Sequence, residues 1–422
     1  MLMTTASDRD SIELSSYIRA GDMVTWGQAA AEPSALIEIL MAQRRQLGGI
    51  RCFIGITSSE AITADCADHI EFSSFTGGHG SARSLSDRGL LRIHPVPYSS
   101  VPRLLSHGES KVDVLLLQLA RTAEDGVFSI SAAQDYLIAA LSSARVVIGQ
   151  VNARAAATHG DRTIAASELA AIIEVDDPIP SSKPQPPSTV DRAIAAEVAS
   201  WVEDFSTLQI GIGRIPDAVL ELLRDRNDLS IHSGLFSEAM ATLVTSGAVS
   251  NAHKGRDHGA SVASFLHGGQ DLLDFAHANP SVQLRRIEYV YDPAVLASLP
   301  RFVAVNSALE VDVTGQVNAE SVAGRYVGTV GGAGDFLRAA AHSDGGVPII
   351  ALPSATRTGS RIVAALDGPT STARCDVGVI VTEHGSADLR GLPIRERIER
   401  MIAIAHPDHR DALADQAQGL RT

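Results

Sequence analysis

The segment LQIGIGRIPDAVLELL, residues 208–223, contains the strand, turn and helix pattern that is typical of an α/β protein. Residues 208–210 have β character and precede two glycines at 211 and 213, and Pro216 suits a first helical position. The expected helix has an apolar face formed by Val219, Leu220, Leu222 and Leu223. A glycine turn that leads into a helix offers backbone amides to an anion or an oxyanion, although many such turns are only tight turns. Pro216 occupies the third glycine position of the dinucleotide fingerprint, so this is not a dinucleotide site.

Both halves of the chain alternate short apolar runs with longer helical patterns. The first helical pattern covers residues 33–46. Continuous apolar runs separated by helices predict parallel sheets that are covered on both faces. We therefore expect an α/β protein with two similar open, mostly parallel sheet domains. The expected strands are residues 23–26, 52–56, 112–117 and 146–151 in the first half, and 208–212, 229–231, 302–305, 348–352 and 377–381 in the second.

A proline-rich segment separates the two halves. Prolines alternate with serines over residues 177–189, a composition that favours an extended linker and cannot continue a helix. The segment predicts an N-terminal domain over residues 1–180 and a C-terminal domain over residues 190–422.

The charge of the chain restricts what it can bind. The 422 residues include 35 basic and 49 acidic side chains, for a net charge of −14, and the only lysines are Lys111, Lys183 and Lys254. This balance argues against a nucleic-acid partner, since phosphate binding needs clustered basic residues. Any anionic ligand would be held by arginines, helix N-termini and backbone amides.

Cysteine spacing and hydropathy indicate the class of protein. The three cysteines, Cys52, Cys66 and Cys375, have no paired spacing and predict neither a disulfide framework nor a metal site. The N-terminus has no signal-peptide pattern, and no apolar run is long enough to span a bilayer. We expect a cytoplasmic protein with no membrane partner.

A second glycine loop contains Gly328, Gly331, Gly332 and Gly334. Such a loop lets the backbone approach a ligand, or forms a crowded turn between a strand and a helix, and both interpretations stay open. The expected helix after it carries Phe336, Leu337, Ala340 and Ala341. The phosphate loop, the HExxH zinc pair and the GxSxG nucleophile elbow are missing from the sequence. His253 and His258 lie in a loop that we expect at the surface.

Ten segments of the chain carry distinctive motifs. In the second half they are GIGRIPDAVL (211–220), IHSGLFSEAM (231–240), NSALEVDVTGQVNAES (306–321), GGAGDF (331–336), IIALPSAT (349–356), VTEHGSADLRG (381–391) and AHPDHR (405–410), and in the first half FSSFTGGHGSAR (72–83), VDVLLLQLARTAEDGVFSIS (112–131) and VIGQVN (147–152). In their order and spacing, the segments of the second half resemble the acetyl-CoA hydrolase/transferase family, which includes 4-hydroxybutyrate and succinate:acetate CoA-transferases. The first half resembles the family more loosely.

The resemblance implies a fold and a chemistry. Members of the family have two similar α/β domains with an active site between them, and move coenzyme A between carboxylates through a glutamyl-CoA thioester. The Ile212 amide would stabilise the oxyanion. Acyl-CoA and a small carboxylate would be the substrates, no cofactor would be bound covalently, and the chain would form a homodimer. Motif matching places the CoA-binding residues at Gly211, Ile212, Gly213, Arg214, Ile215, Leu309, Gly328 and Gly332.

The chain departs from the family pattern at the nucleophile. Active transferases resemble I-H-[ST]-E-M-x-S-D-G here, whereas this chain has Gly234 at the position of the glutamate. Glu238 matches the later acidic position, and Glu310 does not match the nucleophile either. A second departure is Asp344, which stands before paired glycines where relatives commonly have a lysine that contacts CoA. A negative charge there should weaken binding or change what binds.

Three hypotheses follow from Gly234. The chain could hydrolyse acyl-CoA, with water in the space of the missing carboxylate and Glu238 or His232 as general base, since Glu238 would share a helix face with Gly234. It could transfer CoA by direct attack of the acceptor carboxylate. It could also bind a CoA ester without turnover, as a regulatory or partner subunit.

Each residue has a simpler interpretation too. Gly234 would suit a helix N-cap, and Glu238 would be an exposed acid that favours the helix dipole. Arg357 and Arg361 could reach CoA phosphates or be solvated.

Overall fold

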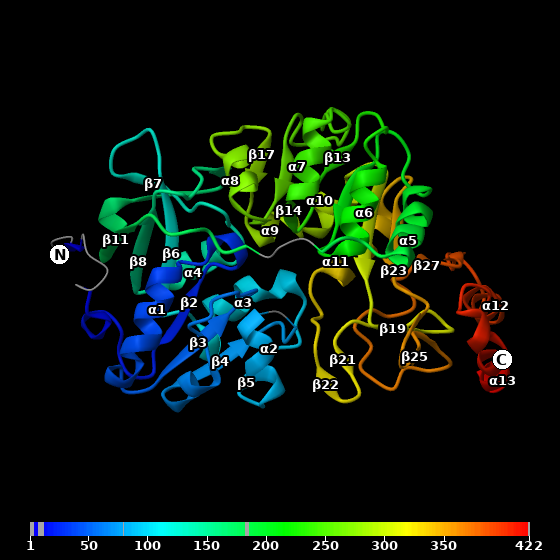
Figure 1. The fold of residues 1–422 in the computed structure, drawn as a ribbon. Helices are drawn as coiled ribbons and strands as arrows, with labels where there is room; N and C mark the ends of the chain where they lie inside the picture. Colours follow the sequence, from blue (N-terminus) through cyan, green and yellow to red (C-terminus); the bar gives the residue numbers. More distant parts are fainter. Residues whose placement is uncertain (1–3, 7–11, 79, 182–184, 421–422) are drawn as a thin grey trace. The chain divides into compact units, whose positions relative to one another are not determined.

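The computed structural model describes residues 4–6, 12–78, 80–181 and 185–420 of the chain (Figure 1). Two compact units are distinguished by their internal contacts. The first unit comprises residues 1–182, 235–238 and 262–290, and the second comprises 183–234, 239–261 and 291–422.

The first unit is built on a ten-stranded sheet. Eight strands follow the order β1-β11-β8-β6-β2-β3-β4-β5 and pair in parallel, and β7 pairs antiparallel with β6 and β10. All but the last residue of β6 are buried, as expected for a strand that is covered on both faces. The strands are β1 (Thr4–Ala6), β2 (Met23–Trp26), β3 (Ile50–Ile54), β4 (Ile70–Ser74), β5 (Leu91–Ile93), β6 (Val114–Arg121), β7 (Val127–Ser129), β8 (Val146–Asn152), β10 (Thr163–Ala165) and β11 (Ala171–Val175).

Helices of the first unit cover this sheet. Leu36, Ile37 and Leu40 of α1 belong to the same buried cluster as Val24 of β2 and Cys52 of β3. The helices are α1 (Ser34–Gln43), α2 (Gly80–Asp87), α3 (Val101–Ser106), α4 (Leu137–Ser143), α8 (Gln270–Ala276) and α9 (Ile287–Val290). Short strands complete the unit. β14 (Leu235–Ser237) pairs with β16 (Phe265–His267), and β9 (His159–Gly160) pairs with β17 (Val282–Leu284) in a three-stranded sheet of order β15-β17-β9.

The second unit is built on a six-stranded sheet in the order β13-β12-β18-β23-β27-β28. Its strands are parallel except for β28, which pairs antiparallel with β27. The carboxyl ends of β13, β12 and β18 therefore lie next to one another at one edge. The strands are β12 (Thr207–Ile210), β13 (Ser230–Ile231), β18 (Phe302–Ser307), β23 (Val347–Ala351), β27 (Val379–Thr382) and β28 (Gly385–Asp388).

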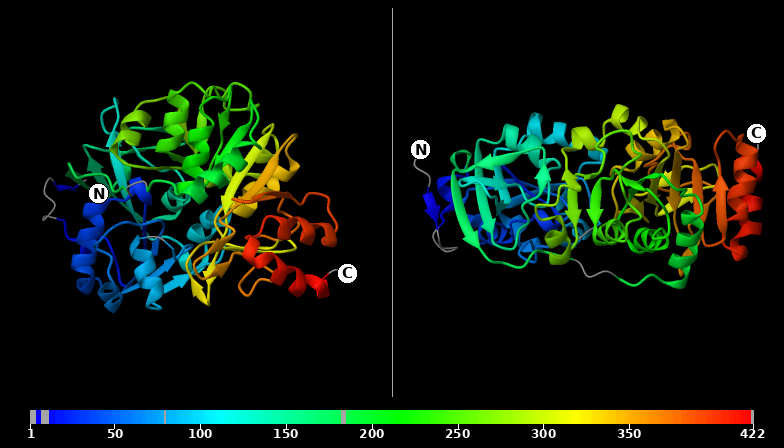
Figure 2. Two further views of the ribbon diagram at one scale, coloured as in Figure 1. Left: turned by 45° about the vertical axis from the view of Figure 1, so that its right-hand side comes forward. Right: turned by 90° about the horizontal axis from the view of Figure 1, so that it is seen from above.

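Six helices and several short strands surround the second sheet. The C-terminal helices α12 and α13 lie side by side, with α12 against β28 (Figure 2). The helices are α5 (Thr189–Ala199), α6 (Arg214–Leu222), α10 (Pro293–Ala297), α11 (Ala333–His342), α12 (Ile394–Ala403) and α13 (Arg410–Gln416). The short strands are β19 (Glu310–Asp312), β20 (Val317–Asn318), β21 (Ser321–Val322), β22 (Arg325–Tyr326), β24 (Ala355–Thr356), β25 (Gly359–Ser360) and β26 (Ile362–Val363). Two further elements, α7 (Glu238–Thr245) and β15 (Ser261–Ala263), contain residues of both units.

The predicted fold class is confirmed, and each apolar run that predicted a strand overlaps an observed strand. The helical details differ. Helix α6 begins at Arg214, so Pro216 is its third residue, and Leu222 is half exposed because it lies on the solvent side of the helix. In α11, Ala339 is buried and Ala341 is exposed. None of the described helices has the length and apolar character needed to cross a bilayer.

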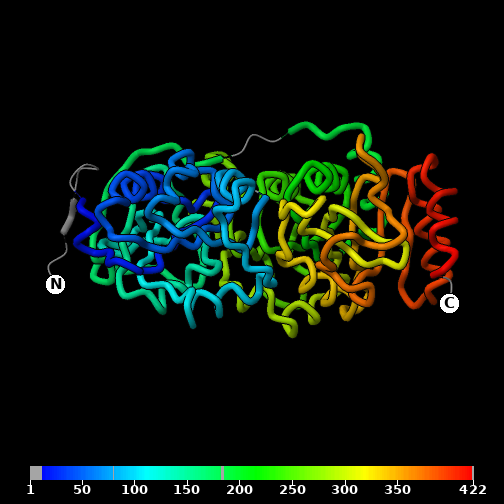
Figure 3. Tube along the Cα trace, turned by 90° about the horizontal axis from the view of Figure 1, so that it is seen from below, coloured from blue at the N-terminus to red at the C-terminus, as the bar shows by residue number. Residues whose placement is uncertain are grey.

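The proline-rich segment has no regular structure over residues 177–181 and 185–188. Figure 3 shows the chain running extended from residue 185 toward α5. The domain limits at 1–180 and 190–422 stay a prediction, because residues 235–238 and 262–290 group with the first unit by their contacts.

A buried polar cluster follows β2 in the first unit. Gln28 Nε2 donates to Tyr98 Oη at 2.6 Å and to Asp135 Oδ2 at 2.7 Å, and Tyr98 Oη donates to Asp135 Oδ2 at 3.1 Å. The amide of Leu137 donates to Asp135 Oδ1 at 3.2 Å. Burial raises the pKa of Asp135 to about 6 despite these hydrogen bonds, because a carboxylate loses its hydration there.

The raised pKa predicts a pH-dependent effect of Asp135→Asn. The native state holds the Asp135 proton more tightly than the unfolded state, so this group stabilises the fold below about pH 4 and loses that contribution as the pH rises through about 6. The unfolding free energy of the variant minus that of the natural chain should rise by about 3 kcal/mol between about pH 4 and pH 6. Urea unfolding at a series of pH values measures the difference. A lost acceptor shifts the curve equally at every pH, so a pH-independent difference would contradict the prediction.

Candidate functional site

Most of the residues that the motifs single out lie at the carboxyl edge of the sheet of the second unit. Residues 211–215 follow β12, residues 232–234 follow β13, and Leu309 follows β18. Because these three strands are adjacent and parallel, the structure brings the three segments together. Ligands of open α/β sheets bind at this edge.

The turn after β12 has the geometry that a glycine permits. Gly213 has a φ of 130° and a ψ of 178°, and it is the N-cap of α6. The side chain of Ile212 is 37% exposed, which is unusual for isoleucine. Among the described residues, none accepts a hydrogen bond from the Ile212 amide. This amide can therefore donate to a ligand.

Arg214, at the start of α6, is held by a carboxylate. Its Nε lies 3.3 Å from Asp191 Oδ2, and the Asp191 side chain is only 5% exposed. Asp191 Oδ2 also accepts from the Ser188 amide at 2.8 Å in the capping box of α5. The ion pair fixes α6 to α5 and leaves Arg214 less free to reach a phosphate.

The segment after β13 is tied to its neighbours by backbone contacts. The Ile231 amide donates to Asn251 Oδ1 at 2.9 Å, and the His232 amide donates to the Leu208 carbonyl at 3.0 Å. Ser233 Oγ donates to the Ile210 carbonyl at 3.2 Å. His232 is fully buried, so a role as general base would require the site to open.

Gly234 faces an aromatic side chain. A Cβ built on Gly234 would overlap Tyr291 Oη and would lie 3.2 Å from Tyr291 Cζ and 3.5 Å from Phe336 Cε2. The expectation that water fills the space of a missing carboxylate is therefore wrong for the volume directly beside Gly234. The phenol of Tyr291 occupies it.

The two predicted glycines of the second loop have different neighbours. A Cβ on Gly332 would overlap Tyr291 Cε1, so Gly332 and Gly234 flank the same ring. A Cβ on Gly328 would overlap the Ala319 carbonyl, and the Gly328 amide donates to the Glu320 carbonyl at 2.9 Å. Gly328 thus has a backbone-packing role. Leu309 is half-buried, and its amide donates to the Asn318 carbonyl at 2.9 Å.

Glu238 does not share a helix face with Gly234. Residues 235–237 form β14 and α7 begins at Glu238, so the four-residue spacing does not run along a helix. Glu238 Oε1 accepts from the Gly269 amide at 2.7 Å, where Gly269 is the N-cap of α8. The N-cap interpretation of Gly234 is also wrong, since no helix starts there. Glu238 is half-buried and supports a turn of the first unit, so the simpler interpretation was wrong about its exposure. It does lie in the first turn of α7, where an acid favours the helix dipole, as that interpretation expected.

Lys254 is a buried cation that the sequence did not suggest. It is fully buried, and its Nζ donates to the carbonyls of Ile231, at 3.0 Å, and of Ala260. His253 and His258 in the same loop are exposed, as predicted. A lysine in a polar loop normally indicates surface, so the only available signal was the rarity of lysine in this chain.

The remaining charged candidates differ in burial. Asp344 and Arg357 are exposed, and Arg361 is half-buried. Burial lowers the pKa of Arg361 below its usual value. Glu310 is also half-buried, and burial followed by the charge of Asp367 raises its pKa. Of the two arginines, Arg361 is the one that lies partly inside the protein.

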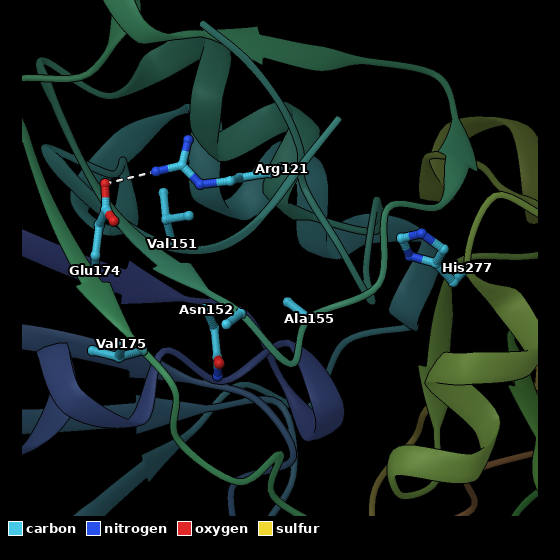
Figure 4. Close-up of a pocket in the computed structure, with 8 residues that line it drawn as sticks. Arg121, Val151, Asn152, Ala155, Glu174, Val175 and His277 are labelled. Atoms are coloured by element: carbon cyan, nitrogen blue, oxygen red, sulfur yellow. Dashed lines mark hydrogen bonds and ion pairs between the residues drawn. The ribbon is translucent and has the colours of Figure 1, made fainter. Parts of the chain in front are cut away.

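A separate pocket of about 320 Å³ lies in the first unit (Figure 4). Arg121 and Glu174 form an ion pair of 2.7 Å on one side of it, and His277 lies on the opposite side. Asn152 Nδ2 donates to Gln118 Oε1 at 3.2 Å and to the Asp177 carbonyl at 3.0 Å, and His277 Nδ1 accepts from the Ala157 amide at 3.2 Å. Protein partners thus already engage its polar groups. Elsewhere too, the described residues contain no cluster of three or more His, Cys, Asp or Glu suited to a metal ion.

Comparison with known proteins establishes the family. Residues 9–181 match the acetyl-CoA hydrolase/transferase N-terminal domain, and residues 268–417 match the acetyl-CoA hydrolase/transferase C-terminal domain. The chain belongs to the acetyl-CoA hydrolase/transferase family. The predicted resemblance is confirmed.

Relatives of this family member include transferases and hydrolases. The chain is 34% identical over 407 residues to 4-hydroxybutyrate coenzyme A transferase of Clostridium kluyveri, with 95% of each chain covered. It is 30% identical over 218 residues to acetyl-CoA hydrolase of Kluyveromyces lactis, covering 50% of this chain and 40% of the hydrolase. The crystal structure of RipA from Yersinia pestis is similar with a TM-score of 0.92 at 32% identity, covering 99% of this chain and 97% of RipA.

Lys254→Met tests how strongly this family member depends on its buried lysine. The substitution removes the donor to two buried carbonyls, which should lower the unfolding free energy by about 2–5 kcal/mol. Lys111→Met is the matched control, because Lys111 is exposed and its loss should change stability by less than about 0.5 kcal/mol. Denaturant unfolding of both variants gives the comparison. Equal stability of the two would show that the Lys254 contacts do not support the fold.

Proposed function

We propose that this protein moves coenzyme A between an acyl-CoA and a carboxylate without forming an enzyme-bound thioester. The observation that carries the proposal is the surroundings of Gly234, which has no side chain and faces the Tyr291 hydroxyl. The family motif has its glutamate nucleophile at this position. A chain without that carboxylate needs another nucleophile, and the acceptor substrate is itself a carboxylate.

The proposed reaction has two balanced steps. The acceptor carboxylate attacks the thioester carbonyl, the carbon–sulfur bond breaks, and a mixed anhydride and CoA thiolate result. The thiolate then attacks the acceptor side of the anhydride, which forms the new thioester and releases the donor carboxylate. None of the described residues accepts a hydrogen bond from the Ile212 amide. This amide would stabilise the tetrahedral oxyanion.

The CoA-binding residues are part of the same proposal. The turn at residues 211–215, Leu309 and Gly332 would contact CoA, and Gly328 would act through the shape of its loop. A cytoplasmic homodimer that takes acyl-CoA and a small carboxylate fits this chemistry. The full-length match to a CoA-transferase favours transfer over hydrolysis.

Hydrolysis of acyl-CoA is the second candidate, because an acetyl-CoA hydrolase matches half of the chain. It requires a base for the attacking water. Glu238 already accepts from the Gly269 amide, and His232 is fully buried. These contacts make transfer the better supported function. If the protein neither transfers CoA nor hydrolyses acyl-CoA, it binds its ligand without turnover.

Steady-state kinetics distinguish direct transfer from the covalent route. With acyl-CoA and acceptor varied together, direct transfer should give intersecting double-reciprocal lines, because both substrates must be bound before reaction. Borohydride trapping followed by intact-mass analysis should detect no glutamyl adduct. Parallel lines with a trapped single-site adduct would reject the proposal, and background turnover with CoA binding by calorimetry would indicate a binding protein.

Two Glu238 substitutions separate a structural role from general-base catalysis. Glu238→Gln keeps an oxygen acceptor for the Gly269 amide. The rate of thiol release from acyl-CoA should therefore stay within about threefold, and the unfolding free energy within about 0.5 kcal/mol. Glu238→Ala removes the acceptor and should cost about 1–3 kcal/mol of stability. A loss of thiol release by about a hundredfold or more in Glu238→Gln, with stability unchanged, would instead assign Glu238 as the base.

A further inference from the structure

Tyr291 lies between two glycine backbones. Its hydroxyl occupies the place of a Cβ on Gly234, and its Cε1 occupies the place of a Cβ on Gly332. Cζ of the same ring lies 3.2 Å from each of these two Cβ positions. The ring therefore fits only because both positions lack a side chain.

Buried aromatic rings pack against Tyr291. The ring centroids of Tyr291 and Phe336 are 4.6 Å apart, and those of Phe336 and Phe302 are 6.3 Å apart. Tyr291 is 6% exposed, Phe336 is 2% exposed and Phe302 is fully buried. Because protein cores are close-packed, a shift of Tyr291 requires its aromatic neighbours to shift as well.

Hydrogen bonds hold the backbone next to Tyr291 in place, and the backbone of Gly234 has no unusual conformation. Asp292, the residue after Tyr291, caps α10 by accepting from the Ala294 amide at 2.8 Å and the Val295 amide at 2.9 Å. Gly234 does not have a positive φ, so its backbone would accept any side chain. What excludes a side chain at position 234 is therefore the steric contact with Tyr291.

We propose that Tyr291 and Gly234 are a coupled pair in which the tyrosine takes the place of the family's nucleophilic side chain and closes the covalent route. Tyr291 is then a positioning residue that determines which chemistry the site can perform. The inference rests on the proposed function for its meaning, but the coupling itself is a property of packing. A glutamate restored at position 234 would reach the site only when Tyr291 is shortened.

A double-mutant cycle on thermal unfolding tests the coupling. Gly234→Ala should lower the Tm of the natural chain by about 3–8 °C, because the new methyl group overlaps the Tyr291 hydroxyl. In the Tyr291→Phe background the same substitution should lower Tm by less than about 2 °C, since the nearest ring carbon is then 3.2 Å from the new methyl group. Gly334→Ala is the matched control, because a Cβ there meets no atom within 4 Å, and its effect should be the same in both backgrounds. Equal effects of Gly234→Ala in the two backgrounds would overturn the inference.

Adduct trapping tests the chemical consequence. Gly234→Glu, Tyr291→Ala and the Gly234→Glu/Tyr291→Ala double variant are incubated with acyl-CoA, reduced with borohydride and examined by intact mass, with CoA binding measured by calorimetry. A glutamyl adduct in the double variant alone supports the coupling. An adduct on the Gly234→Glu single variant would contradict the coupling. A double variant that folds and binds CoA but forms no adduct would contradict it as well.

The two proposals fail in different ways. An adduct on the natural chain would reject direct transfer while leaving the thermal coupling intact. Equal effects of Gly234→Ala in the two backgrounds would reject the role of Tyr291. The double-reciprocal pattern of the natural enzyme would not change. If the double variant does not fold, the thermal cycle of the milder variants decides.

Discussion

The contact of the Tyr291 phenol with the backbones of Gly234 and Gly332 is the constraint on which the proposed chemistry depends. Three chain segments that are far apart in sequence meet there. The contact leaves no room for a side chain at position 234, between β13 and β14. In the proposed function, a hydroxyl therefore stands where the family motif has a carboxylate.

Strand ends and backbone hydrogen bonds build the scaffold around this contact. Adjacent parallel strands deliver the 211–215 turn, the 232–234 segment and Leu309 to one edge of the sheet, where an open α/β protein binds ligands. Gly213 makes the turn possible and the Ile212 amide can still donate to a ligand. Lys254 holds the Ile231 carbonyl just before the 232–234 segment. These contacts are the support that the proposed acyl-CoA site would use.

Much of this arrangement could be predicted from the sequence, for identifiable reasons. Buried parallel strands require continuous apolar runs, so four strands of the first sheet (β2, β3, β6 and β8) and all of the second sheet except β28 could be predicted. Short or polar strands such as β5 and β28 lack such a run. The glycine turn before α6 could be predicted from its spacing. Gly234 stood out because a motif with a required residue type was broken. Tyr291 was missed because its neighbours, Gly234 and Gly332, are distant in sequence. Residues 235–237 were taken as helix because their pairing partner, residues 265–267, is equally distant.

In the proposed reaction Tyr291 lies beside the reacting centre, and no covalent thioester forms on the protein. A crystal structure of the natural chain soaked with acyl-CoA tests this arrangement most directly. We expect an intact thioester whose carbonyl lies beside Tyr291 and within reach of the Ile212 amide, with no covalent bond to the protein. A CoA thioester on any glutamate, or an acyl group bound away from Tyr291, would contradict the proposed reaction.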